Sequence, residues 1–143
     1  MLDAMWCMQS GRTPISWLCR QNVYDLHPTD AELAELNQTA GAMIIFDMKD
    51  KVEQERLLSH LIAAGLDINA PHALSPVKWT ALHSAVIGSP WDVALLLNHG
   101  ARTDIKDGKG LTPLDLALQL QGRAPIPERA EAIKLLQAAQ AAR

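Results

Sequence analysis

The sequence predicts an all-α fold built from stacked helix pairs, on three observations. Apolar residues make up 48% of the chain, and most are Leu and Ala, which favour helices. Aromatic residues that suit strands are scarce, with one Phe and one Tyr. Signals for helix starts and helix ends also recur at nearly constant spacing along the chain. The length of 143 residues suits a single domain.

Two kinds of landmark define the repeat. The segments 79–85 and 111–117 align, and their threonines, Thr80 and Thr112, are 32 residues apart. The segments 65–69 and 100–104 also align; each begins with a glycine after a Leu-rich stretch, and the glycines are 35 residues apart. Units of such a period cannot bury their apolar faces alone, so they gain a core by stacking.

Local signals predict where the helices begin and end. Thr80 and Thr112 can cap a helix N-terminus, and Pro113 suits the first helical position. The run 89–92, Ser-Pro-Trp-Asp, predicts the start of a second helix in the same way, and Pro127 predicts the start of the last helix. The two landmark glycines stand where a left-handed residue commonly ends a helix.

Two loops are expected to be long, and the last helix is expected to cap the stack. Residues 70–77 lengthen the hairpin before Trp79, and residues 122–126 lengthen the turn inside the last repeat. Prolines keep both segments out of helix. The helix predicted from Glu128 to about Ala142 carries one apolar and one polar face. Such a helix can cover its neighbour and face water, as a terminal repeat requires.

These residues resemble the ankyrin repeat. Residues 80–83 (Thr-Ala-Leu-His) and 112–115 (Thr-Pro-Leu-Asp) are similar to the Thr-Pro-Leu-His helix start of that family. The segment 100–112 resembles the hairpin between successive ankyrin repeats. The resemblance covers about residues 50–143. It implies an all-α ankyrin-repeat solenoid of helix-turn-helix repeats joined by short hairpin loops.

We therefore expect one ankyrin-repeat domain over residues 1–143, with about four repeats of which the first two are degenerate. The segment 11–16 looks like a degenerate helix start, and 43–46 would occupy another without the Thr or the Pro. The expected units are a degenerate N-terminal repeat or a different helical cap, a degenerate repeat, a regular repeat and a C-terminal capping repeat (1–42, 43–73, 74–107 and 108–143).

Charge and hydropathy exclude several functions. The net charge of −3 and the lack of a basic stripe argue against nucleic acid as a partner. No apolar run reaches the roughly 18–20 residues that a bilayer span needs, so no membrane partner is expected. The chain begins Met1-Leu2-Asp3 without a basic segment before an apolar one, which predicts a cytoplasmic protein.

Catalytic, metal and cofactor sites are not predicted. The two cysteines, Cys7 and Cys19, are read as small apolar residues of the N-terminal helical region, since neither has a close partner for zinc. The histidines are too far apart for a metal site, and 108–110 is a hairpin tip, not a phosphate loop. We expect no enzyme and no cofactor; a cysteine-dependent enzyme is the remaining alternative.

His83 is expected to be structural. In ankyrin repeats the histidine of this motif bonds to neighbouring backbone, which fixes its tautomer. Asp115 stands in the equivalent place of the next repeat, so the position accepts another polar side chain.

The resemblance implies a protein that binds another protein through a concave surface and hairpin tips, as an adaptor or an inhibitor. An inhibitor of a toxin, of the immunity type, is one version, and a self-associating structural protein with Trp6 and Trp17 at a contact is another. A monomer is expected. Carried onto this sequence, the partner-binding candidates are Trp79, Ser84, Ile87, Asp104, Lys106, Asp107, Lys109 and Leu111. Trp79 could instead pack under the 70–78 loop, and Trp91 is expected to pack against an adjacent repeat.

Overall fold

The structure, a computed structural model, describes residues 28–46, 48–73 and 75–142. These residues form helices and no strand, which confirms the all-α prediction. In chain order the elements are α3 (Asp30–Gln38), the 3₁₀ helix η1 (Gly41–Ile45), α4 (Lys51–Ala64), α5 (Ala81–Ala85), α6 (Pro90–Asn98), α7 (Pro113–Arg123) and α8 (Pro127–Ala141). The expectations on residues 11–16 and on Trp6, Cys7, Trp17 and Cys19 lie outside this part of the chain.

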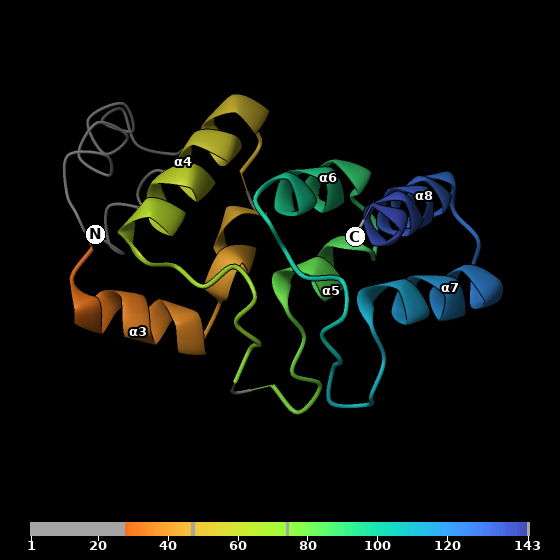
Figure 1. Ribbon diagram of the computed structural model, residues 1–143, viewed down its shortest axis with the longest axis horizontal. Coiled ribbons are helices and arrows are strands. Elements are labelled where there is room, and N and C mark those ends of the chain that lie inside the picture. The colour runs from red at the N-terminus through yellow and green to blue at the C-terminus, as the bar shows by residue number, and fades with distance from the viewer. Residues whose placement is uncertain (1–27, 47, 74, 143) are drawn as a thin grey trace.

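The helices stack as three successive pairs, the arrangement of an ankyrin solenoid (Figure 1). The first helices, η1, α5 and α7, contact one another in series, and each is followed by a second helix, α4, α6 or α8. We call the contact between the η1–α4 and α5–α6 pairs the first junction, and that between the α5–α6 and α7–α8 pairs the second junction. The loops that enter α5 and α7 lie on one edge of the stack, at the bottom of Figure 1.

The helix boundaries follow the local signals closely. The hydroxyl of Thr112 accepts a hydrogen bond from the backbone N–H of Asp115, 3.2 Å away, and the Asp115 carboxylate accepts from the N–H of Thr112 at 3.0 Å. Ser89 caps α6 by accepting from the N–H of Asp92. Gly65 ends α4 in the left-handed region, with φ of 113°.

One predicted boundary is wrong. Gly122 and Arg123 continue α7, so the connection to α8 shortens to residues 124–126. A glycine inside a helix costs only about 1 kcal/mol relative to alanine, which packing can offset. The helix ends at Ala124 because Pro125 disfavours helical backbone in the residue before it.

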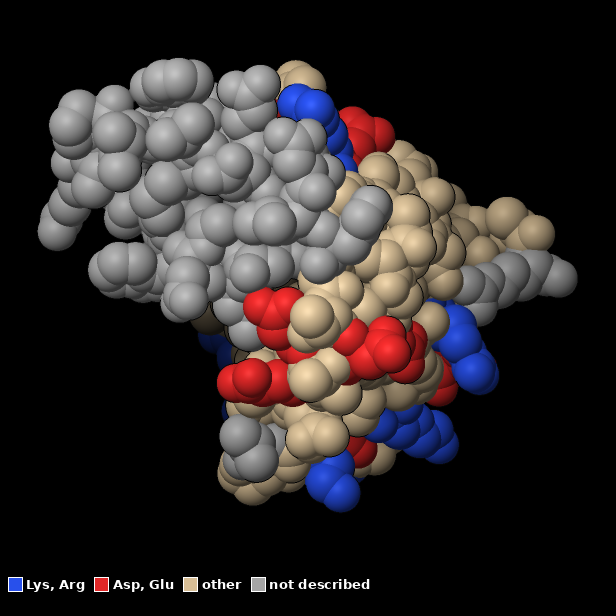
Figure 2. All heavy atoms as spheres, turned by 90° about the vertical axis from the view of Figure 1, so that its left-hand side faces the viewer, with Lys and Arg blue, Asp and Glu red and all other residues tan. Residues whose placement is uncertain are grey.

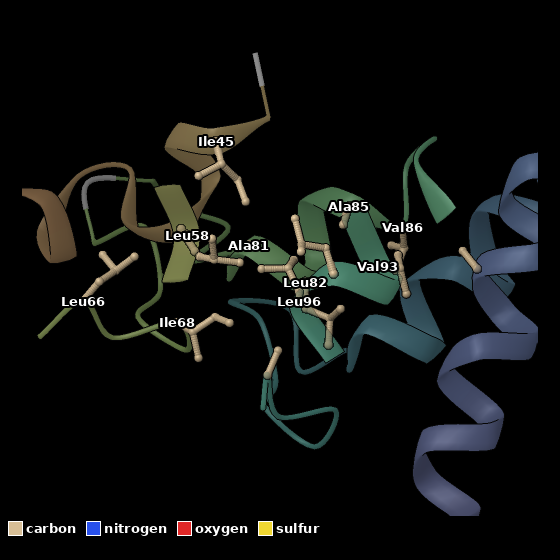
Figure 3. Close-up of a cluster of buried hydrophobic side chains, with 14 of the residues drawn as sticks. Ile45, Leu58, Leu66, Ile68, Ala81, Leu82, Ala85, Val86, Val93 and Leu96 are labelled. Carbon is tan, nitrogen blue, oxygen red and sulfur yellow. The ribbon is translucent and has the colours of Figure 1, made fainter. Parts of the chain in front are cut away.

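The core runs through the stack without interruption (Figure 3). Leu58 of α4, Leu82 of α5 and Leu96 of α6 are fully buried and point toward one another across the first junction. Leu136 of α8 continues the same cluster at the second junction. Truncating one such leucine to alanine typically costs about 2–5 kcal/mol of stability. The small side chain of Ala85 allows α5 to pack closely between its neighbours.

A ladder of asparagine side chains keeps successive pairs in register. The carbonyl oxygen of the Asn37 side chain accepts a hydrogen bond of 3.0 Å from the backbone N–H of Asp67. Asn69, 32 residues further on, accepts one of 2.8 Å from the N–H of Arg102. Because each bond joins one unit to the next, the ladder fixes how the loops line up along the edge of the stack.

The two ends of the described stack differ in character. The end formed by α3 presents acidic side chains, to which this helix contributes Asp30, Glu32 and Glu35 (Figure 2). At the other end, Leu118 of α7 is 47% exposed, whereas Val86, at the same distance after its helix-start threonine, is fully buried. Val86 is covered by the α7–α8 pair, and the described residues contain no further pair to cover Leu118.

Among the helices of the described segments, none combines the length and hydropathy that a bilayer span requires.

Candidate partner-binding surface

The hairpin between α6 and α7 is built around one buried carboxylate. Asp107 accepts hydrogen bonds from the backbone N–H groups of Lys109 (2.8 Å) and Leu111 (3.0 Å) and from the indole N–H of Trp79 (3.1 Å). Burial tends to raise the pKa of Asp107, but these donated hydrogen bonds outweigh it, so the pKa lies below the ordinary value. The ionised carboxylate therefore fixes the tip as a closed turn.

His83 anchors the base of the same hairpin. Its Nε2 lies 3.0 Å from the carbonyl oxygen of Leu111, so Nε2 carries the proton. Nδ1 then accepts from the backbone N–H of Thr80 at 3.3 Å and from the Thr80 hydroxyl at 2.8 Å. Burial lowers the pKa of His83, and the bond to Leu111 and the nearby Asp107 carboxylate oppose this only in part. The structural role expected of His83 is confirmed by these contacts.

A backbone contact joins this hairpin to the preceding loop. The N–H of Gly108 donates a hydrogen bond of 2.7 Å to the carbonyl of Val77. A Cβ atom at position 108 would lie 2.5 Å from the carbonyl oxygen of Pro76, a distance that real side chains do not reach. Glycine is required here because the two loops touch through their backbones.

The exposed side chains of the hairpin are charged. Asp104, Lys106 and Lys109, all predicted contact residues, are exposed there together. Arg102, which the sequence reasoning missed, is also exposed and forms an ion pair of 2.6 Å with Asp104. The signal that could have found it is its place in the repeated segment 100–104, where its backbone joins the asparagine ladder and its side chain is exposed. These four side chains form what we call the hairpin surface.

Three other predicted residues hold the fold from partly or fully buried positions. Trp79 and Leu111 are half-buried and pack against the core, and Asp107 is buried. Each also makes an internal hydrogen bond that positions the hairpin. The structure therefore gives these three residues a supporting place beneath the hairpin surface, and the Trp79 indole bonds to Asp107 of the following hairpin.

The last two predicted residues lie away from the hairpin. Ser84 is half-buried at the first junction, where its hydroxyl donates to the sulfur of Met43 at 3.0 Å. Ile87 is exposed, but it follows the far end of α5, about 10 Å along the helix axis from Thr80. The structure does not bring either residue to the hairpin surface.

Trp91 joins two repeats, as expected, and remains partly open to solvent. Its indole N–H donates a hydrogen bond of 2.9 Å to the side-chain oxygen of Gln54 in α4, and 37% of the residue is exposed. Gln54 itself is buried and donates to the carboxylate of Asp92. These three polar side chains form a network across the first junction.

The described residues contain no group of three or more His, Cys, Asp or Glu side chains arranged to hold a metal ion.

Comparison with known proteins gives one informative similarity. No family model matches the chain. The mouse protein named "Ankyrin repeat and SOCS box protein 16" is 38% identical over 74 residues, which are 51% of this chain and 16% of that protein. This chain therefore spans about a sixth of the length of that curated relative.

Sequence similarity and structure agree on the family. Successive helix pairs follow the spacing that the sequence predicted, with capping boxes at Thr80 and Thr112. The relative supplies an independent match to a protein named for its ankyrin repeats. The similarity and the stacked helix pairs together support the resemblance to the ankyrin repeat that the sequence indicates.

Proposed function

We propose that the protein binds another protein through the hairpin surface, formed by Arg102, Asp104, Lys106 and Lys109. The observation that supports the proposal most is the fixed backbone beneath these charges. Asp107 closes the tip with three accepted hydrogen bonds, and Gly108 ties the tip to the neighbouring loop. A surface that is already ordered loses little conformational entropy on binding, so a small contact area can bind well.

The mixed charges of the hairpin surface favour a partner with a complementary charge pattern. Exposed charges contribute more to partner selection and association rate than to affinity. The same surface serves an adaptor, which holds two proteins together, and an inhibitor, which covers a partner's active site. A toxin-directed inhibitor is one form of the second role.

The test compares hairpin variants with a matched control. Lys106→Ala/Lys109→Ala removes two exposed charges from the hairpin, and Glu131→Ala/Lys134→Ala removes two exposed charges from α8. Tagged forms of both and of the wild type are used to capture partners from the native source. Circular dichroism and sedimentation report folding and oligomeric state. Trp79 and Leu111 are left intact because both are half-buried under the hairpin.

We expect one partner to be retained by the wild type and by the α8 variant and lost by the hairpin variant. If a folded hairpin variant retains the same partner at the same yield, the hairpin surface is the wrong one. If the wild type sediments as an oligomer that the hairpin variant does not change, self-association through another surface replaces the proposal.

A further inference from the structure

A pocket of about 330 Å³ opens at the first junction, on the edge of the stack opposite the hairpins. Its walls come from the turn between η1 and α4 and from the turn between α5 and α6. Phe46 and Met48 line one wall, and Ser89 and Trp91 line the other. The backbones of α4 and α6 approach each other much less closely than those of α6 and α8, and the pocket occupies the resulting space.

The floor of the pocket is fixed by the buried network described above. Gln54 spans the junction from α4 by donating to Asp92 and accepting from the Trp91 indole. The amide nitrogen and the amide oxygen of Gln54 are both engaged in these hydrogen bonds. Neither Gln54 nor the Trp91 ring can therefore turn into the pocket and fill it without breaking one. The pocket is thus held open by hydrogen bonds between residues nearly forty positions apart in the sequence.

The charged residues that line the pocket are two lysines at its mouth and Asp92, whose carboxylate is buried and accepts a hydrogen bond from Gln54. Lys49 and Lys51 are both exposed and both line the pocket. The ammonium of Lys51 lies 4.8 Å from the centre of the Trp91 ring, a cation–π contact that holds the charge at the rim. Asp50, between the two lysines, turns its carboxylate to the N–H groups of Val52 and Glu53 as the cap of α4. Its charge is therefore engaged in the helix start.

We propose that this pocket binds an acidic segment of a partner protein, with a Glu or Asp side chain on the two lysines and an adjacent apolar side chain inside. The lysines would repel a cationic segment. Phe46, Met48 and the exposed part of Trp91 offer apolar surface beside them. The volume is at the lower end of the range for ligand sites, which suits one or two side chains. The proposal shares with the proposed function only that the partner is a protein, because it concerns a different surface.

The test is an NMR titration of the whole protein with two blocked peptides. The acidic probe is acetyl-Glu-Leu-Glu-Phe-Glu-amide, and the control probe has Lys in place of each Glu. The reporters are the indole N–H of Trp91, assigned from a Trp91→Phe variant, and the side-chain amide of Gln54. We expect the acidic probe to shift both signals in a saturable way, and the basic probe to leave them unchanged.

Charge-reversal variants place the contact. Lys49→Glu/Lys51→Glu is expected to weaken binding of the acidic probe roughly tenfold, while Lys106→Glu/Lys109→Glu, with the same change of net charge, leaves it within about twofold. Equal weakening by both variants would mean a general charge effect and would overturn the proposal. So would an acidic probe that shifts neither reporter, or acetate alone acting at the same concentration as the peptide. Loss of the natural partner in the hairpin variant, with peptide binding retained, separates this site from the hairpin surface.

Discussion

Each junction of the stack is bridged by one polar side chain from a second helix, but the second junction is closed and the first contains a pocket. At the second junction, Arg129 of α8 is buried and donates hydrogen bonds to the carbonyls of Ile87 (2.9 Å) and Ala124 (2.7 Å). At the first junction, Gln54 of α4 bonds forward to Trp91 and Asp92 and leaves a pocket beside it. In both cases the bridging side chain comes from the first turns of a second helix.

The difference shows that the core and the edge of a solenoid can be specified separately. Buried leucines and alanines run through both junctions, so the apolar packing does not distinguish them. The edge of each junction depends on one long side chain. At the second junction, the guanidinium of Arg129 reaches across and closes the gap between the pairs. At the first junction, the shorter amide of Gln54 leaves the pocket open. Four variants test this comparison, in order of decreasing expected effect.

Arg129→Ala should open the second junction and cause the largest loss. Two carbonyl oxygens, of Ile87 and Ala124, would lose their partners, and the buried guanidinium would leave a cavity. We expect the free energy of unfolding to fall by about 3 kcal/mol. Urea denaturation followed by circular dichroism measures it. Lys134→Ala, an exposed change on the same helix, should stay within about 0.5 kcal/mol. One lost hydrogen bond typically costs about 1 kcal/mol of stability. If Arg129→Ala lowers the free energy of unfolding by less than about 1 kcal/mol, Arg129 does not close the junction.

Gln54→Ala should weaken the first junction by about 2 kcal/mol, because the Asp92 carboxylate and the Trp91 indole N–H both lose a partner. The same urea experiment applies, with Gln137→Ala on the exposed face of α8 as the control. The Trp91 indole signal should also move in the NMR spectrum. An unchanged signal in a destabilised variant would mean that Gln54 acts through packing alone.

Acid should loosen the hairpin side of the second junction through His83. The folded state depresses the pKa of His83, so the unfolded chain takes up the proton first as pH falls. The stability that His83 contributes is complete above the ordinary value of about 6.5 and declines as pH falls toward the folded pKa. Urea midpoints between pH 7.5 and 5 should decline more steeply for the wild type than for His83→Gln. Parallel curves would assign the decline to other groups.

Lys51→Ala should change stability least, within about 0.5 kcal/mol, because the cation–π contact with Trp91 is exposed. Its effect should appear instead in the indole signal of Trp91, which loses the ammonium above its ring. Lys49→Ala, two residues away, serves as the control and should leave that signal nearly in place. Equal shifts in the two variants would argue against a defined position for Lys51.

The sequence predicted what local chemistry decides and missed what distant residues decide. The starts at Thr112 and Ser89 and the end at Gly65 were predicted because caps act within three or four residues. The hydrogen bond between Trp79 and Asp107 joins residues that are 28 positions apart, so no local signal indicates it. The sequence therefore suggested Trp79 as a partner contact, whereas in the structure its indole supports the hairpin.

The pocket was missed for a similar reason. Gln54 reads as an ordinary polar residue of a helix, and only the stacked structure places it against Trp91 and Asp92. Ser84 was carried over from the family pattern as a contact, but its hydroxyl faces Met43 of the preceding unit, which no spacing rule indicates. Asp104, Lys106 and Lys109 were predicted to be exposed because a turn tip must be exposed whatever lies around it, whereas Arg102 of the same surface was missed.

Gly108 makes the two loops on the hairpin edge mechanically dependent. Its N–H meets the carbonyl of Val77, with no room for a side chain between the backbones. The long 70–78 loop thereby acts as a brace for the shorter hairpin. A change in its length or composition would alter the orientation of Lys106 and Lys109 without touching either residue. Sequence changes in this loop are therefore a way to alter partner binding indirectly, by shifting the hairpin backbone that carries Lys106 and Lys109.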